Sequence, residues 1–335
     1  MINLGIFVGE NDWTFFNDIY DELSRRYHTH VFQRKTYAVP ILHGRLNRWR
    51  YSRDIQNLLN NADVCFFEWS SDLLAVASFM PKKCKIIARL HSFELLDWAP
   101  KINWDSVDRL IVLSDSIRLM FSELYSAHAH KVIVIHNGCS LIRFKSSPEK
   151  EFDFTLGMLG SIAPIKRVYE VMLMLSILVE KGYPAKLRIA GNPYGDDRYA
   201  VAIHRQMQRL GLQGHIFFDG FVKDTPGWLQ KIDVFISNSY WEGQQTSLIE
   251  ALASGCYCLS HSWNGVAEML PPENIYLLEA ELMEKIIAYS NLPGGRKNEL
   301  RSQMRLQAEK KFDIESTKEK IAGLIEQEAT HSTLS

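Results

Sequence analysis

Short apolar runs alternate with longer amphipathic stretches along almost the whole chain. The runs are hydrophobic on consecutive residues, a pattern typical of strands that are buried on both faces. They predict strands at Leu4–Val8, Val31–Arg34, Val64–Glu68, Ile86–Leu90, Arg109–Leu113, Val132–His136, Phe154–Leu159, Lys186–Ala190, Ile216–Asp219, Val234–Ser237 and Tyr257–Ser260.

The stretches between these strands predict helices. The expected positions are Asn17–Tyr27, Asp54–Asn60, Ser116–Tyr125, Arg167–Lys181, Arg198–Leu210 and Leu248–Ser254, with a helical tail from Leu300 to Glu328. Strand–helix alternation of this kind indicates parallel sheets joined by right-handed crossovers. The fold class that follows is α/β.

A polar segment that contains a proline interrupts the alternation at 143–152, and a new strand–turn–helix series begins directly after it. We interpret it as the linker between two doubly wound domains, residues 1–145 and 152–299, followed by a terminal helix at 300–330. A chain of 335 residues suits two domains. Open α/β sheets bind ligands at the carboxyl ends of their strands, so two such domains that face each other would form a cleft.

The formal net charge is −1, so no field of the whole protein selects a partner. No acidic residue lies between Glu22 and Asp54, however, and the segment 25–53 is rich in arginine, with Trp49 and Tyr51 among the arginines. This segment is open to two interpretations, a solvated basic face or contact with an anionic membrane or a phosphorylated lipid. Nucleic acid would use similar residues but is not the expected partner.

The five cysteines lack the spacing of a zinc site, and we interpret them as free, buried thiols in a reducing compartment. The N-terminal residues 2–8 resemble a strand rather than a signal peptide. The longest apolar runs fall short of the ~20 residues that a bilayer requires. We therefore expect a cytoplasmic protein, peripheral at the inner face of a membrane where the basic segment makes contact.

The most informative polar residues follow the predicted strand Val234–Ser237. Its polar loop contains Glu242, and a helix then begins near residue 246 with Glu250 in its first turns. The unpaired N–H groups at a helix start form an anion site. Either glutamate alone is equally a surface or capping residue, but together they suit a ligand that has both phosphate and hydroxyl groups. The amides that would hold the phosphate belong to Thr246, Ser247 and Leu248.

The stretch from Glu242 to Gly255 resembles the E-x7-E region of the large retaining glycosyltransferase family 4. Further segments resemble the same family in the expected order, namely Val134–Gly138, Leu159–Arg167, Leu187–Asn192 and Phe218–Val222. The resemblance implies the GT-B fold, in which two Rossmann-like domains face an interdomain cleft. It also implies a terminal helix that packs back on the N-terminal domain.

The resemblance further implies how a donor is held. Lys166, in a phosphate-binding loop that begins at Gly160, would neutralise the donor diphosphate, and a departing nucleoside diphosphate does develop negative charge. Ser161 stands where the family usually has arginine. Either Arg167 supplies a second positive charge, or Lys166 is the only positive charge at the site. Glu242 would meet the hydroxyls of the transferred sugar, and Glu250 those of the ribose.

Other donor contacts follow from the same resemblance. Gly220, Phe221 and Val222 would contact the base through backbone atoms, although Phe221 is equally well explained as a core aromatic. Gln245 replaces the second glycine of the family pattern, which leaves backbone contacts intact but not sugar selectivity. Asn192 completes this set of donor-binding residues.

In the N-terminal half, His91 follows the strand Ile86–Leu90 and resembles the active-site histidine of the family's N-terminal domain. It would bond to the transferring sugar or help to orient the acceptor. Gly9 follows the first strand, where the backbone could approach the donor phosphates or the acceptor. With Lys166 and Glu242, His91 makes up the expected catalytic set.

The sequence thus predicts a transferase that moves a sugar, with retention, from a nucleoside diphosphate donor to an acceptor hydroxyl. UDP-sugars are the expected donors, and carbohydrate or lipid-linked molecules in bacterial surface polysaccharide or glycolipid synthesis are the expected acceptors. No metal site and no cofactor apart from the nucleotide sugar are expected. A GT-B nucleotide-sugar epimerase and a non-catalytic GT-B-like partner subunit are the alternatives.

Overall fold

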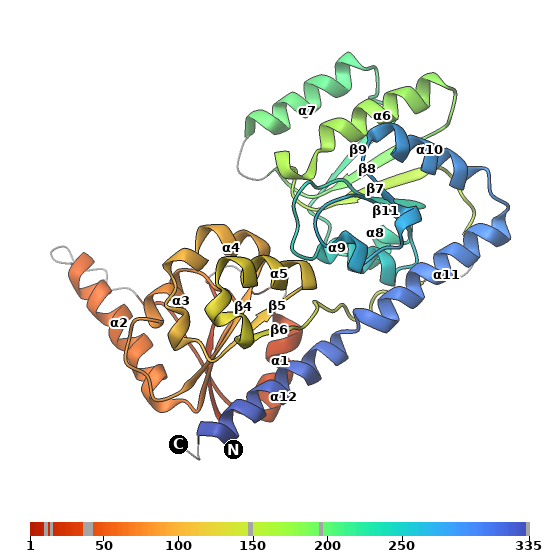
Figure 1. Cartoon of the computed structure of the whole chain (residues 1–335). Coiled ribbons are helices and arrows are strands. Elements are labelled where there is room, and N and C mark those ends of the chain that lie inside the picture. The colour runs from red at the N-terminus through yellow and green to blue at the C-terminus, as the bar shows by residue number, and fades with distance from the viewer. Residues whose placement is uncertain (10–12, 14–15, 36–42, 147–149, 194–196, 333–335) are drawn as a thin grey trace. The chain divides into compact units, whose positions relative to one another are not determined.

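The computed structural model spans residues 1–335 and describes all of them except 10–12, 14–15, 36–42, 147–149, 194–196 and 333–335. Its contacts divide the chain into two compact units (Figure 1). Unit 1 comprises Met1–His136 together with Ile314–Ser335, and unit 2 comprises Asn137–Asp313. The described part of the polar segment 143–152 lies within unit 2, where Phe144 is buried in the core.

Unit 1 contains a six-stranded parallel sheet with the order β2-β1-β3-β4-β5-β6. Its order reverses between β1 and β3, which is where ligands bind in doubly wound sheets. The strands are β1 (Asn3–Phe7), β2 (His28–Val31), β3 (Val64–Phe67), β4 (Lys85–Leu90), β5 (Arg109–Val112) and β6 (Val132–Val134). The α-helices are α1 (Asn17–Arg26), α2 (His43–Asn61), α3 (Asp72–Ala77), α4 (Ser92–Asp97), α5 (Asp115–Leu124) and α12 (Ile314–Ser332).

Both faces of this sheet are buried, as the runs of consecutive apolar residues require. Successive side chains of β3 point to opposite faces, so Val64 packs in the same cluster as residues of α1 and α12, and Cys65 packs with residues of α2 to α5. Arg109 of β5 and Glu328 of α12 form an ion pair at 2.7 Å. Apolar burial and this ion pair together hold the C-terminal helix on unit 1.

Unit 2 contains a second six-stranded parallel sheet, with the order β12-β11-β10-β7-β8-β9 and a reversal between β7 and β10. Its strands are β7 (Thr155–Leu159), β8 (Lys186–Ala190), β9 (Ile216–Gly220), β10 (Val234–Ser237), β11 (Tyr257–His261) and β12 (Ile275–Tyr276). Its α-helices are α6 (Val168–Glu180), α7 (Asp197–Arg209), α8 (Thr225–Leu229), α9 (Thr246–Ala253), α10 (Glu279–Ser290) and α11 (Gly294–Lys311).

Helices cover both faces of the second sheet as well. Figure 1 shows α6, α7 and α10 together on one side and α9 with α11 on the other. The five cysteines of the chain are buried and free, which confirms that part of the sequence interpretation. Among the described helices, none is both long enough and apolar enough to cross a bilayer.

Three predicted elements are placed differently by the structure. The strand predicted at Val31–Arg34 is wrong, because β2 covers residues 28–31. Since β2 is an edge strand, its residues are partly exposed and do not form an apolar run. The helix predicted at Asp54–Asn60 begins at His43, since few apolar residues mark the first half of α2. The helical tail predicted as continuous is divided into α11 and α12 at Phe312, whose buried ring ends α11.

Candidate active site

Three glycines close the carboxyl ends of β7, β8 and β9 in unit 2. Gly160, Gly191 and Gly220 have φ angles of 144°, 143° and 63°, which favour glycine. The N–H of Gly191 donates to the carbonyl oxygen of Gly220 at 2.7 Å. A Cβ atom on Gly191 would lie 1.9 Å from the carbonyl oxygen of Gly160. The ends of β7 and β8 therefore approach each other backbone to backbone, and no side chain would fit between Gly160 and Gly191.

A small hollow lies where β7 and β10 end, at the point where the order of the sheet reverses. The sequence-predicted residues in its lining are Gly160, Ser161, Lys166 and Gln245, joined by Asn238 and Ser239. The carboxyl ends of neighbouring strands at a reversal form the usual crevice for a ligand in such sheets. Parallel pairing thus brings the predicted phosphate-binding loop against the loop that follows β10.

An ion pair between Lys166 and Glu242 joins these two loops. The Nζ atom of Lys166 contacts Oε1 of Glu242, and the hydroxyl of Ser239 donates to the same oxygen at 2.7 Å. The two charged side chains keep 20% and 16% of their exposure. They are partly desolvated, so charges act more strongly on a ligand here than in open water, yet they remain accessible to it.

Arg167 follows Lys166 directly but is held elsewhere. Its backbone has a left-handed φ of 51°, and its guanidinium contacts Glu279 and lies 3.6 Å from Glu170. Its carbonyl oxygen accepts a hydrogen bond from Nδ2 of Asn238 at 2.9 Å. Two carboxylates already balance the charge of Arg167. This arrangement favours the interpretation in which Lys166 alone supplies the positive charge to a donor.

Gln245 precedes α9 and is buried, with its side chain used inside the protein. Its Oε1 accepts from the hydroxyl of Ser237, and its Nε2 donates to the hydroxyl of Ser247 at 3.1 Å. These bonds fix the start of α9 to the end of β10. The side chain of Gln245 thus stabilises the start of α9, while its predicted contact with the donor through the backbone stays a prediction. The first-turn amides of α9, at Thr246, Ser247 and Leu248, lie at the helix end that attracts anions.

Glu250 lies half-buried on α9, one helical turn after the residues of its start. Burial raises the pKa of Glu250 to about 7, and the charge of Arg143 opposes this only in part. The carboxyl group therefore holds its proton more tightly than an ordinary glutamate. A buried charge without close compensation indicates a group retained for binding rather than for stability.

The remaining donor residues of the prediction lie around β8 and β9. The carbonyl oxygen of Asn192 accepts from the N–H of Ile162, at 2.9 Å, which ties the loop after β8 to that after β7. Phe221 is 73% exposed, so the alternative that it is a core aromatic is wrong. Val222 is partly buried against the core of unit 2.

In unit 1, His91 caps the start of α4 at the carboxyl end of β4. The backbone N–H of His91 donates to Oε2 of Glu94 at 2.7 Å, and the Nδ1 atom of the ring lies 3.4 Å from the same oxygen. The imidazole stacks on the indole of Trp69, with ring centroids 4.0 Å apart. The aromatic stack therefore orients the side chain, while its Nδ1 is buried without a hydrogen-bond partner among the described residues.

The charges around His91 are buried. Arg89 and Glu68 form an ion pair at 2.7 Å with 1% and 0% exposure, and burial raises the pKa of Glu68 to about 7. Burial also raises the pKa of Glu94 well above its ordinary value. Burial, and then the charge of Arg89, lower the pKa of His91 well below 6.5. His91 is therefore neutral at neutral pH and serves as a hydrogen-bonding group rather than as a cation.

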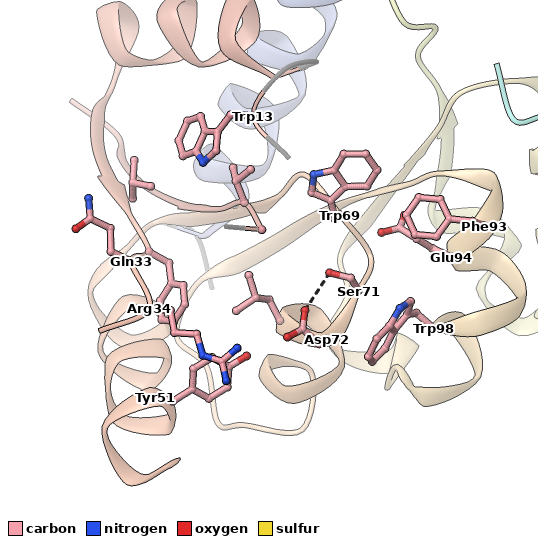
Figure 2. Close-up of a pocket in the computed structure, with 15 residues that line it drawn as sticks. Trp13, Gln33, Arg34, Tyr51, Trp69, Ser71, Asp72, Phe93, Glu94 and Trp98 are labelled. Atoms are coloured by element: carbon pink, nitrogen blue, oxygen red, sulfur yellow. Dashed lines mark hydrogen bonds between the residues drawn. The ribbon is translucent and has the colours of Figure 1, made fainter. Parts of the chain in front are cut away.

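A pocket of about 580 Å³ lies at the carboxyl ends of the strands of unit 1. Gly9, which the sequence analysis placed at the site, lines it. Glu94 lines it too, as do residues that the sequence analysis missed, among them Trp13, Trp69, Asp72 and Trp98 (Figure 2). The signal for Trp69 was its position directly after the predicted strand Val64–Glu68, and Asp72 lies three residues further along the chain. The family resemblance has no segment there, so it did not point to them.

Comparisons with known proteins agree with this geometry. Residues 153–290 match the family model described as glycosyl transferases group 1. The poly(glycerol-phosphate) alpha-glucosyltransferase of Bacillus subtilis is 28% identical over 131 residues, which cover 38% of this chain and 19% of that protein. The UDP-Gal:alpha-D-GlcNAc-diphosphoundecaprenol alpha-1,3-galactosyltransferase of Escherichia coli is 27% identical over 173 residues, 47% of this chain and 43% of that protein. The chain thus spans less than half the length of these relatives.

Similar solved structures cover the whole chain. HepE of Anabaena, solved in complex with UDP and glucose, has a TM-score of 0.80 at 17% identity and covers 97% of this chain and 100% of its own. A glycosyltransferase of Rickettsia africae has a TM-score of 0.74 at 12% identity, with 98% of each chain covered. The chain therefore has the two-domain, Rossmann-like GT-B fold, as predicted.

The raised pKa of Glu250 predicts a pH-dependent stability. Between its ordinary value of 4.5 and about 7, the folded protein holds a proton that the unfolded chain releases, so stability falls as pH rises through this window. The substitution Glu250→Gln removes this loss. Urea unfolding should find the variant more stable than the wild type near pH 8, by up to about 3 kcal/mol, and nearly equal to it near pH 4.5.

The control for this prediction is Glu284→Gln, which changes an exposed glutamate of α10 in the same unit. It should track the wild type across the whole pH range. A constant difference between Glu250→Gln and the wild type at all pH values would contradict the assigned titration.

Proposed function

We propose that this chain transfers a sugar from a nucleoside diphosphate donor, a UDP-sugar, to an acceptor hydroxyl with retention of the anomeric configuration. The observation that carries the proposal is the ion pair of Lys166 with Glu242 at the sheet reversal of unit 2, beside the start of α9. The group 1 glycosyltransferase match over residues 153–290 supports it. The UDP in the HepE structure and the UDP-Gal donor named for the E. coli relative support the choice of nucleotide.

The diphosphate would be held by Lys166 and by the first-turn amides of α9. Charge grows on the diphosphate as the bond to the sugar breaks, and donors that are already in place stabilise this charge without reorganising. Lys166 would exchange Glu242 for the phosphate as its partner. Glu242, still bonded to Ser239, would then accept hydrogen bonds from hydroxyls of the sugar. No metal ion is needed for this part of the chemistry.

Two points support retention of the anomeric configuration: the family resemblance, and the hydrogen-bonded, ion-paired condition of Glu242. Glu242 is the carboxylate nearest the phosphate-binding groups, and its pairing with Lys166 and Ser239 makes it a poor nucleophile. We therefore expect the departing phosphate to assist attack on the face that it leaves. Glu250 would bond to the ribose hydroxyls, where a carboxylate can accept two donors at once.

Unit 1 would hold the acceptor near His91. The neutral imidazole can bond to a hydroxyl without placing a positive charge next to the sugar that is being transferred, which itself becomes positive in such transition states. The proposed setting is bacterial surface polysaccharide or glycolipid synthesis. The acceptor polymers and lipids in the names of the relatives support it.

The direct test is the release of UDP from a panel of UDP-sugars by the purified protein. Lys166→Ala should lower the turnover rate by about a hundredfold or more, as expected when a hydrogen-bonding cation that stabilises the developing negative charge is lost. Lys181→Ala, which changes an exposed lysine after the other end of α6, should leave it unchanged. Equal rates for wild type and Lys166→Ala would contradict the proposal, as would formation of an epimeric UDP-sugar without acceptor.

We further propose that α2 places unit 1 against an anionic membrane. Arg45, Arg48 and Trp49 are exposed and lie three and four residues apart, so they share one face of the helix. Tyr51, which the sequence grouped with Trp49, instead lines the pocket of unit 1. Arg53 is paired with Asp54 at 3.6 Å and covers the ring of Trp49. The face that remains combines two cations with an aromatic anchor, as interfacial helices do.

Flotation with vesicles tests this contact. The wild type should bind vesicles of phosphatidylcholine with phosphatidylglycerol, and not those of phosphatidylcholine alone. Arg48→Glu should weaken binding by at least about fivefold, because each basic residue near such a surface contributes about 1 kcal/mol. Arg296→Glu on α11 is the matched control, an exposed arginine in unit 2. Equal binding of both variants and the wild type would exclude α2 as the contact.

A further inference from the structure

The pocket of unit 1 contains polar atoms that the protein itself leaves unsatisfied. Nε1 of Trp69 and Oε1 of Glu94 are both buried and have no hydrogen-bond partner among the described residues. Both residues line the pocket, and the side chain of Glu94 has no exposed area. A buried donor and a buried acceptor without partners are costly, so their presence at one cavity indicates a ligand with hydroxyl-like groups.

Aromatic side chains form much of the wall around these atoms. Figure 2 shows Trp13, Trp69, Phe93 and Trp98 around an open centre, with Asp72 hydrogen-bonded to Ser71 beside it. The ring of Phe93 is 51% exposed, which is unusual for so large an apolar group. Flat apolar walls with a few polar groups suit a ligand that has both C–H faces and hydroxyls.

The charges at the pocket exclude a strongly anionic ligand. Among the described lining residues, Arg34 is the only cation, and its guanidinium lies over the ring of Tyr51, 5.2 Å from the centroid. The carboxylate of Asp72 faces the same space and offsets that charge. A phosphate site would be expected to gather several cations. Two helices do begin at this pocket, α3 and α4, but each is only six residues long and has a carboxylate in its first turn, Asp72 and Glu94, which disfavours an anion there.

We infer that this pocket binds a neutral sugar ring of the acceptor. The inference rests on the proposed transferase function and specifies its acceptor. Trp98 would cover a C–H face of the ring, while the indole N–H of Trp69 donates to one hydroxyl and Glu94 and Asp72 bond to others. His91, the residue expected to orient the acceptor, stacks on Trp69, and Trp69 lines this pocket. A pocket of about 580 Å³ is within the range of sites for small molecules.

Saturation-transfer NMR tests the inference on the full chain, with saturating UDP present. The probes are the methyl α-glycosides of glucose, galactose and N-acetylglucosamine, compared with glycerol 3-phosphate and with octanol as a substitute for a lipid chain. At least one glycoside should receive about threefold more saturation than either of the other two probes. Trp69→Phe, which keeps an aromatic ring but removes the N–H, should lower that signal about threefold or more.

Two control variants locate the bound glycoside. Trp49→Phe makes the same change on helix α2, and Glu284→Gln changes an exposed glutamate of α10 in unit 2, outside the proposed donor site; neither should change the glycoside signal. A stronger signal from glycerol 3-phosphate or octanol, no signal from any probe, or a glycoside signal insensitive to Trp69→Phe would overturn the inference.

The thermal shift with UDP separates this failure from failure of the proposed function. If UDP raises the melting temperature and UDP-sugars are turned over while no glycoside binds, only the acceptor inference is wrong. If UDP has no effect on the melting temperature, the donor site itself is wrong.

Discussion

The ion pair of Lys166 with Glu242 is the interaction on which the rest of this account depends. The two residues are 76 positions apart, and they meet because β7 and β10 are neighbours at the reversal of the second sheet. Both side chains keep part of their exposure, so a ligand could reach the pair. The bond from Ser239 holds Glu242 in place, so exchange of Lys166 to a phosphate would not release the carboxylate.

Under the proposed function, the two units would have different chemical roles. Unit 2 presents an accessible cation and a helix start, and both suit a ligand that carries and gains negative charge. Unit 1 buries its charges in the pair of Glu68 with Arg89 and leaves His91 neutral beside an aromatic pocket. The arrangement in unit 2 suits a leaving group that becomes negative, and the arrangement in unit 1 suits an acceptor hydroxyl. A transferase needs one of each.

Much of the fold could be predicted from the sequence, because strands buried on both faces appear as uninterrupted apolar runs. The bounds of β8 and β10 agree with the prediction to the residue. The edge strand β2 was misplaced since its exposed residues break such a run, and the six-residue helices α3 and α4 are too short to show a helical period.

The site was predicted less completely, because a motif gives residue types but not their hydrogen-bond partners. Lys166 and Glu242 were both expected to meet the donor, yet their contact with each other depends on strand order and has no local signal. Gln245 was predicted at the donor site from the motif, but the bonds of its side-chain amide to Ser237 and Ser247 have no local signal in the sequence. Trp69 and Asp72 stayed unnoticed because an aromatic or acidic residue after a strand is common.

The most direct test of the central claim is calorimetric titration of the protein with UDP, UMP and uridine. If Lys166 and the start of α9 hold the diphosphate, UDP should bind at least about tenfold more tightly than UMP or uridine, since hydrogen bonds to charged groups contribute about 1.5–3 kcal/mol each. Lys166→Ala should remove most of that difference and leave the affinity for uridine unchanged. Equal affinities for UDP and uridine, or a difference that survives Lys166→Ala, would contradict the account.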